Sequence, residues 1–290
     1  MPIPMNSVCA QCLMGRHVEN ARRLGDDATA TAFAKGIMQA FLDMPEEADS
    51  SLIGREITKL YTKYYGLGQD RYQEEKVQSN AFVMERLPQI RQMVAQSENP
   101  VYTALQFSVL GNYLDFAALH GQVKFEDLEK MLLQACDMDL TGAGYDRFCQ
   151  DLAKARRVVV ITDNAGEIVF DWVLAENLQK AYPDLEVTFL VRGGPANNDA
   201  TREDTKAIGL PYDVVDSGVC VGGTPLKELS PQAMTAVHSA DVLIAKGMGN
   251  TESLYGCGLN VYYAFLVKCK RFEQFFGKPH LTPMFVAEPR

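Results

Sequence analysis

The sequence has little positive charge for its size. Its 290 residues include 28 Lys and Arg against 37 Asp and Glu, which gives a formal net charge of −9 at pH 7. Nucleic-acid binding depends on neutralising phosphates with Lys and Arg, so this balance argues against a nucleic-acid partner. We expect a small metabolite as the partner. If that metabolite is a phosphate, something positive must be recruited to offset the acidic field.

The sequence also lacks a long hydrophobic run. No stretch of about 18 apolar residues could span a bilayer, and the N-terminus has no basic region followed by an apolar segment of signal-peptide length. We therefore expect a cytoplasmic protein with no membrane partner. Hydrophobic residues make up 47% of the chain and charged residues 22%, a globular composition that excludes a disordered chain.

Cysteine and histidine are too scattered for a disulfide framework or a structural zinc site. The seven cysteines are an odd number, so we expect mostly reduced thiols. Cys9 and Cys12 have the spacing of half a zinc site, but the chain has no second pair of this kind, and its four histidines form no ligand-spaced pair. We interpret Cys9 and Cys12 as a buried, reduced pair.

The pattern of apolar residues changes near residue 156. Before this point it has helical spacing, and it predicts helices at 28–44, 51–66, 74–96, 101–119 and 125–135. After it, short apolar and β-branched runs predict strands at 156–162, 185–191, 212–216, 241–246 and 282–288. Helical segments lie between most of these runs, at 166–182, 198–209 and 230–240. Strands alternating with helices imply right-handed parallel crossovers and hence a doubly wound, mostly parallel sheet.

Polar and glycine residues follow four of the expected strands. Asp163 and Asn164 follow the first strand, Asp199 lies in the loop after the second, and Asp216 begins a third such loop. Ligands of such sheets bind beyond the carboxyl ends of the strands. Two Asn-Asp loops after neighbouring strands favour convergence on one hard divalent cation over two unrelated helix caps. At the fourth strand end, Lys246 and a Gly-rich turn form a candidate phosphate clamp.

Six motifs in the chain resemble those of one known family. They are CAQCLMGR (9–16), GNYLDF (111–116), ITDNAGEIVFD (161–171), VRGGPANNDAT (191–201), AKGMGNTES (245–253) and AFLVKCK (264–270). Together they resemble the damage-control phosphatase family, long called domain of unknown function 89, in its smaller microbial branch. The resemblance covers essentially the whole chain. It implies an α/β/α sandwich with a helical N-terminal region, one divalent metal, and hydrolysis of phosphomonoesters of small metabolites such as sugar phosphates or phosphopantetheine derivatives.

The resemblance also implies roles for individual residues. The metal ligands fall on Asp163, Asn164 and Asp199, and Lys246 falls on the phosphate-contacting lysine. The cation is Mn²⁺, Mg²⁺, Co²⁺ or Ni²⁺, because oxygen ligands discriminate weakly among them. Residues expected to bind the substrate are Asn112, Asp115, Arg192, Gly193, Asn198, Lys246, Gly247, Asn250 and Glu252. Thr251 departs from the family, which usually has an aromatic residue before Glu252.

We expect three catalytic residues, Asp163, Lys246 and Glu167. The cation polarises the phosphate and a metal-activated water attacks it, because a ligating carboxylate such as Asp163 has its lone pairs engaged and is a poor nucleophile. Glu167 and Asp171 lie one helical turn apart and serve as a general base or as supports of the ligands. In this scheme residues 1–155 are a helical cap and residues 156–290 the α/β catalytic region, packed as one compact unit.

Three alternatives remain at this stage. Asp137 to Thr141 have the DxDxT spacing of haloacid-dehalogenase phosphatases, but that motif must follow a buried strand and here it continues a helical pattern. Gly247-Met248-Gly249 lacks the third glycine of a dinucleotide site, because Glu252 occupies that place. A carboxyl methyltransferase, an activity claimed within the wider family, is therefore a weaker reading. A non-catalytic metal- or metabolite-binding protein would use the same loops.

Overall fold

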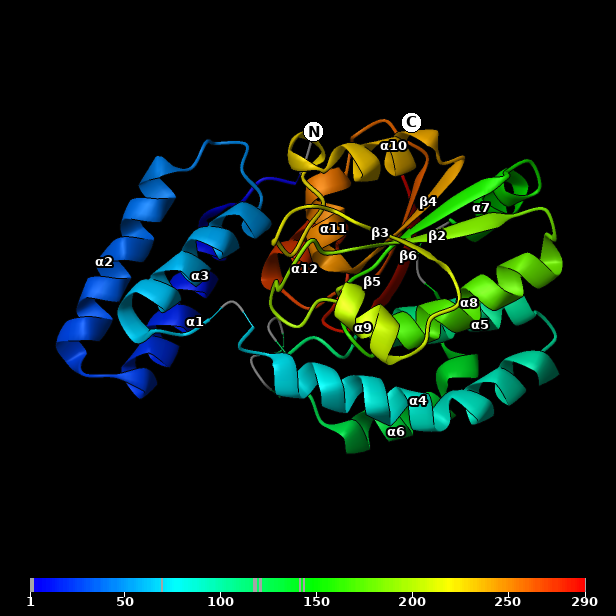
Figure 1. The fold of residues 1–290 in the computed structure, drawn as a ribbon, viewed down its shortest axis with the longest axis horizontal. Coiled ribbons are helices and arrows are strands. Elements are labelled where there is room, and N and C mark those ends of the chain that lie inside the picture. The colour runs from blue at the N-terminus through cyan, green and yellow to red at the C-terminus, as the bar shows by residue number, and fades with distance from the viewer. Residues whose placement is uncertain are drawn as a thin grey trace.

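The molecule is built around a six-stranded sheet with the strand order β3-β2-β1-β4-β5-β6 (Figure 1). The computed structural model describes residues 3–68, 70–116, 119, 122–140, 142 and 144–289. The strands are β1 (Arg157–Ile161), β2 (Glu186–Val191), β3 (Asp213–Asp216), β4 (Val242–Lys246), β5 (Val261–Leu266) and β6 (Pro283–Ala287). All neighbouring pairs from β3 to β5 are parallel, and β6 pairs antiparallel with β5.

The helices follow the predicted alternation in the second half of the chain. They are α1 (Ser7–Leu24), α2 (Asp27–Asp43), α3 (Ser50–Tyr65), α4 (Gln73–Gln96), α5 (Pro100–Gly111), α6 (Phe125–Leu133), α7 (Tyr145–Leu152), α8 (Glu167–Ala181), α9 (Arg202–Ala207), α10 (Pro231–Ser239), α11 (Gly247–Leu254) and α12 (Lys270–Phe276). None of the described helices is long and apolar enough to cross a membrane.

The predicted α/β sandwich is confirmed, because apolar clusters cover both faces of the sheet. Strand β5 was not predicted. Its six residues are all buried, and it lies between β4 and β6 with aromatic side chains on both faces, so it shows no alternating pattern. Helices α1, α7 and α12 were not predicted either. The helix expected at 101–119 ends early, at Gly111, with Asn112 as its C-cap.

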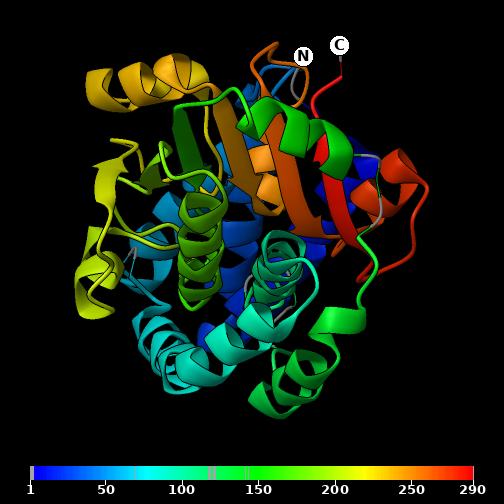
Figure 2. The same cartoon turned by 90° about the vertical axis from the view of Figure 1, so that its right-hand side faces the viewer.

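One face of the sheet is covered by α5 and α8, which are buried almost all round because α4 packs outside them (Figure 2). The two helices approach each other closely at Gly111. A Cβ at this position would lie 2.6 Å from the Phe170 ring of α8. This close approach brings the end of α5 to the carboxyl ends of the strands, where Asn112 and Asp115 follow the helix.

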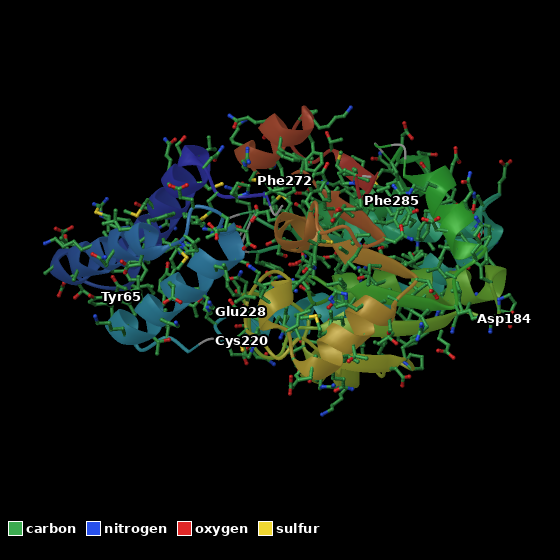
Figure 3. The ribbon with its side chains drawn as sticks, turned by 90° about the horizontal axis from the view of Figure 1, so that it is seen from above. Tyr65, Asp184, Cys220, Glu228, Phe272 and Phe285 are labelled. Atoms are coloured by element: carbon green, nitrogen blue, oxygen red, sulfur yellow. The ribbon has the colours of Figure 1, made fainter. Side chains whose placement is uncertain are left out.

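Helices α1, α2 and α3 form a three-helix unit beside the sheet (Figure 1). Its apolar cluster is centred on Phe33, Ile57 and Tyr61 and is separate from the two clusters that cover the sheet. Polar contacts connect it to the rest of the molecule, including an ion pair of 2.5 Å between Arg55 and Glu228. Figure 3 shows Glu228 and Cys220 on the side of the sheet that faces this unit, with Asp184 at the far end.

Candidate active site

The loops after β1 and β2 are joined by backbone hydrogen bonds. Asn164 and Asp199 form an isolated antiparallel bridge, and the Ala200 N–H donates to the Asp163 carbonyl at 2.7 Å. The chain runs from β1 to β2 and β3 on one side of β1 and returns to β4 on its other side, so β1 and β4 flank the switch point of the sheet. Asp163, Asn164 and Asp199 are thus brought together where ligands of such folds bind.

The two aspartates are buried beside each other with little compensating charge. Burial raises the pKa of Asp163 well above its ordinary value, and the negative charges of Asp199 and Glu167 raise it further. Burial also raises the pKa of Asp199, to about 6, against the opposing effect of Arg192. Arg192 lies between them, with Nε 2.6 Å from Asp199 and Nη2 3.5 Å from Asp163. The pair therefore has an excess of negative charge that a cation would neutralise.

The residues fit a hard divalent cation. The Asn164 side-chain oxygen accepts one hydrogen bond, from Asn198 Nδ2 at 3.0 Å, which leaves a second lone pair on that oxygen. Within the described residues no three Asp, Glu, His or Cys side chains form a metal cluster by themselves. A cation here would be held by Asp163, Asn164 and Asp199, with water and substrate oxygens completing its shell, as Mg²⁺ requires.

Gly247 lies against the Asp163 carboxylate. Its φ of 77° is in the left-handed region, and a Cβ at this position would overlap with the carboxylate. We predicted Gly247 as a substrate contact, but its clear role is to let the β4–α11 turn approach Asp163.

A cavity of about 750 Å³ opens in front of these loops. One wall comes from the strand-end loops, and the other from α1, α3 and the segment after α3. Four of the predicted site residues line it, namely Asp115, Asp163, Asp199 and Glu252. The three-helix unit therefore encloses the space into which the strand-end carboxylates face.

The structure places Lys246, predicted as a phosphate contact, behind the site and not on the cavity wall. Lys246 is fully buried, and its Nζ lies 3.1 Å from Glu167 and 3.2 Å from Asp171 and donates to the carbonyl and hydroxyl oxygens of Ser108 at 2.6 and 2.7 Å. Burial lowers the pKa of Lys246, but Asp171 and Glu167 more than offset this and raise it. Because its donors are engaged inside the protein, Lys246 is absent from the cavity wall.

Glu167 and Asn112 lie behind the carboxylates, not in the cavity. Glu167 is fully buried and accepts from the side chains of Asn112 and Asn164. Asn112 also donates to Asp163 at 3.0 Å and accepts from the Leu266 N–H. Neither lines the cavity, so in this structure Glu167 and Asn112 contact the carboxylates from behind and position them.

The remaining predicted contacts also hold the loops together. Arg192 Nη1 donates to the Asn250 side chain at 2.9 Å, and Asn250 Nδ2 donates to the Thr162 carbonyl at 3.0 Å. The Gly193 N–H donates to the Val219 carbonyl, and Asn198 Nδ2 donates to the Leu114 carbonyl at 2.7 Å. Residues 192, 193, 198 and 250 do not line the cavity, and neither does the predicted metal ligand Asn164.

Two lysines line the cavity, Lys268 and Lys270. The Nζ of Lys268 lies 2.6 Å from Asp115 and donates to the Asn112 carbonyl at 2.8 Å, and Lys268 lines the cavity with Asp163 and Asp199. We did not assign it a role from the sequence. The available signal was its place just after the strand β5, which was itself not predicted.

The sequence profile of the "Damage-control phosphatase ARMT1-like domain" matches residues 5–281. The chain belongs to this family. Strands β1 to β5, the strand-end loops and the N-terminal helices lie within the matched range, and β6 follows it.

Relatives of the chain match it over more than half to nearly all of its length. A damage-control phosphatase of Archaeoglobus fulgidus is 28% identical over 280 residues, which is 94% of this chain and 95% of the relative. A damage-control phosphatase of Pyrococcus horikoshii is 34% identical over 170 residues, 57% of this chain and 58% of the relative. A crystal structure of a DUF89 family protein from P. horikoshii has a TM-score of 0.82 at 25% identity and covers 98% of each chain. Family membership supports a phosphatase.

The sequence contains two other motifs, the DxDxT spacing that begins at Asp137 and the pair of Cys9 and Cys12. Asp137 ends a short 3₁₀ helix that follows α6, so no strand precedes the DxDxT spacing; Thr141 lies outside the described residues. Cys9 and Cys12 are free thiols, but Cys12 is exposed and both line the cavity. The expectation of a buried pair is therefore wrong, because α1 turns this face toward the cavity.

The buried carboxyl of Glu252 should make the free energy of unfolding depend on pH. Burial raises the pKa of Glu252 to about 7, and Ser50 opposes the rise by donating from its N–H and hydroxyl. The folded protein favours the protonated form of Glu252. The stability that this protonation contributes is fully present below the pKa of Glu252 in the unfolded chain, and it is lost as the pH rises through about 7. Glu252→Gln should therefore raise the free energy of unfolding by about 2 kcal/mol more at pH 8 than at pH 5. Urea unfolding at both pH values measures this, and an equal gain would contradict it.

Proposed function

We propose that this protein is a metal-dependent phosphomonoesterase that hydrolyses small phosphorylated metabolites. The observation that carries the proposal is the pair of buried carboxylates, Asp163 and Asp199, beside the Asn164 amide at the mouth of a cavity that also holds Lys268. Family membership supports the reaction class. Sugar phosphates and related damaged metabolites are the proposed substrates.

A divalent cation held by Asp163, Asn164 and Asp199 would supply Lewis acidity and neutralise the charge of the phosphate. The chain's own residues divide the remaining work. Lys268 offers a fixed positive charge to a phosphate oxygen on the cavity side. Arg192 holds both aspartates from behind, so their oxygens keep one geometry while the substrate binds.

We propose that water, and not Asp163, attacks phosphorus. Asp163 Oδ2 accepts from the side chains of Asn112 at 3.0 Å and Asn164 at 2.9 Å, and its other oxygen faces Arg192. A carboxylate held at both oxygens is suited to orienting and poorly suited to forming a covalent bond. Asp115 lies on the cavity wall and contributes to the electrostatics of both aspartates, so we assign it the proton that the water loses.

A metal-reconstitution assay tests this function. The protein is stripped with a chelator, and release of inorganic phosphate from p-nitrophenyl phosphate is followed with Mn²⁺, Mg²⁺, Co²⁺ or Ni²⁺. We expect turnover only after a cation is added. Turnover unchanged in the stripped protein would contradict the metal dependence. Transfer from a labelled methyl donor without any phosphate release would favour the methyltransferase, and metal binding without turnover would favour the binding protein.

A further inference from the structure

The three-helix unit and the segment that follows it bring three arginines to the same cavity as the strand-end carboxylates, and one of them, Arg55, is paired with Glu228. Arg16 comes from α1 and Arg71 from the segment between α3 and α4, and both line the cavity together with Asp163 and Asp199. In a chain with a net charge of −9, two guanidinium groups placed together on a cavity wall are a local exception. They are the feature of this wall that the proposed hydrolysis of a phosphate does not itself use.

A buried histidine and tyrosine hold Arg16 in place. His17 is 6% exposed and Tyr61 is 2% exposed, and His17 Nδ1 lies 3.0 Å from the Tyr61 hydroxyl. Arg16 Nη2 lies 3.1 Å from His17 Nε2. Because an arginine can only donate, Nε2 accepts and the ring proton is on Nδ1, which donates to the Tyr61 oxygen. The guanidinium is thus oriented by a neutral, buried imidazole.

The rings of Tyr61 and Tyr72 orient Arg71. Its guanidinium lies 4.4 Å from the centre of the Tyr61 ring and 5.3 Å from that of Tyr72. Stacking on an aromatic face orients the group and leaves its N–H edge available to a ligand. Burial raises the pKa of Tyr61, while the nearby charges of Arg71 and Arg16 oppose the rise, so both guanidinium groups lie near one hydroxyl.

We propose that Arg16 and Arg71 bind a second anionic group of the substrate, a carboxylate or a second phosphate, while its scissile phosphate lies at Lys268. This inference rests on the proposed function. Guanidinium groups bind both kinds of anion through paired N–H donors. A cavity of about 750 Å³ also holds far more than a phosphate group, in the size range of whole metabolites. The preferred substrates are therefore phosphomonoesters that carry another negative charge.

Matched substrate pairs test this preference. Glucose 6-phosphate is compared with 6-phosphogluconate, which adds a carboxylate, and fructose 6-phosphate with fructose 1,6-bisphosphate, which adds a phosphate. We expect the wild-type kcat/KM to be higher for the doubly anionic member of at least one pair, which also identifies the anion. Arg71→Gln should lower that kcat/KM roughly tenfold, mainly through KM, and change p-nitrophenyl phosphate turnover less than about twofold. Arg71→Lys should restore part of the loss.

Arg23→Gln is the matched control. It makes the same change of arginine to glutamine, but at an exposed position on α1 that does not line the cavity. It should leave both members of each pair unchanged. Equal kcat/KM values within both pairs, or equal losses for all substrates in Arg71→Gln, would overturn this inference while leaving the proposed function intact. Failure of the metal-loaded wild type to hydrolyse any ester, p-nitrophenyl phosphate included, would overturn the proposed function itself and this inference with it.

Discussion

Asp163→Asn is expected to lower the turnover of p-nitrophenyl phosphate with Mn²⁺ by about a thousandfold or more. The substitution keeps the shape of the side chain and removes one of the two charges that would hold the cation. The same change should not weaken the metal-free fold. Asp163 is 6% exposed and is repelled by Asp199 and Glu167, so a neutral amide removes an unfavourable charge.

Initial rates and thermal unfolding of the metal-free protein are the two measurements. Asp199→Asn is the matched variant and should also lose turnover. It should gain less stability than Asp163→Asn, because Asp199 has the closer contact with Arg192. Undiminished turnover in both variants would remove the proposed ligand set. Lost turnover together with an unfolded protein would instead mean that Asp163 is needed for folding.

Lys246→Met is expected to destabilise the protein by about 3–5 kcal/mol. The lysine is fully buried, and its loss leaves the carboxylates of Glu167 and Asp171 buried without their cation. Burial already raises the pKa of Asp171 to about 6 despite the lysine. The free energy of unfolding in urea, measured without metal, gives the size of the effect. A change below about 1 kcal/mol would show that the network does not support the fold.

Lys268→Met is the contrasting substitution. This lysine lines the cavity, so we expect kcat/KM to fall by about a hundredfold. Its side chain is also buried and paired with Asp115, so Lys268→Met should lose stability as well. Turnover measured where each variant is folded therefore separates the two lysines, with the larger fall in Lys268→Met. The opposite result, with turnover depending on Lys246 in a protein of unchanged stability, would restore the assignment made from the sequence.

The case of Lys246 shows that a motif does not reveal what surrounds a side chain in the fold. Strand side chains alternate between the two faces of a sheet. Val242 and Ile244 belong to the apolar cluster under α5 and α8, so Lys246, two residues further, points into the same face. The sequence contains this alternation, but it does not show which helices cover which face, or that Ser108 and Asp171 lie beside Lys246 on this face.

The ligand loops could be predicted for the opposite reason. Asp163 and Asp199 each follow a strand with a clear apolar pattern, and neighbouring parallel strands bring their carboxyl ends to one edge. The strand β5 had no such pattern, since both of its faces are buried. The position of Lys268 depends on β5, so its place in the cavity could not be predicted from the sequence.

The sequence by itself determined the class of the fold, five of the six strands of the second half with most of the helices between them, and the loops that meet at the switch point. These follow from local periodicity and from the chirality of parallel crossovers, which are properties of short segments. Only the tertiary structure decided which polar side chains face the cavity and which are buried behind it. That choice depends on packing between distant segments, as when the buried Tyr61 of α3 contacts His17 of α1 behind Arg16, which lines the cavity.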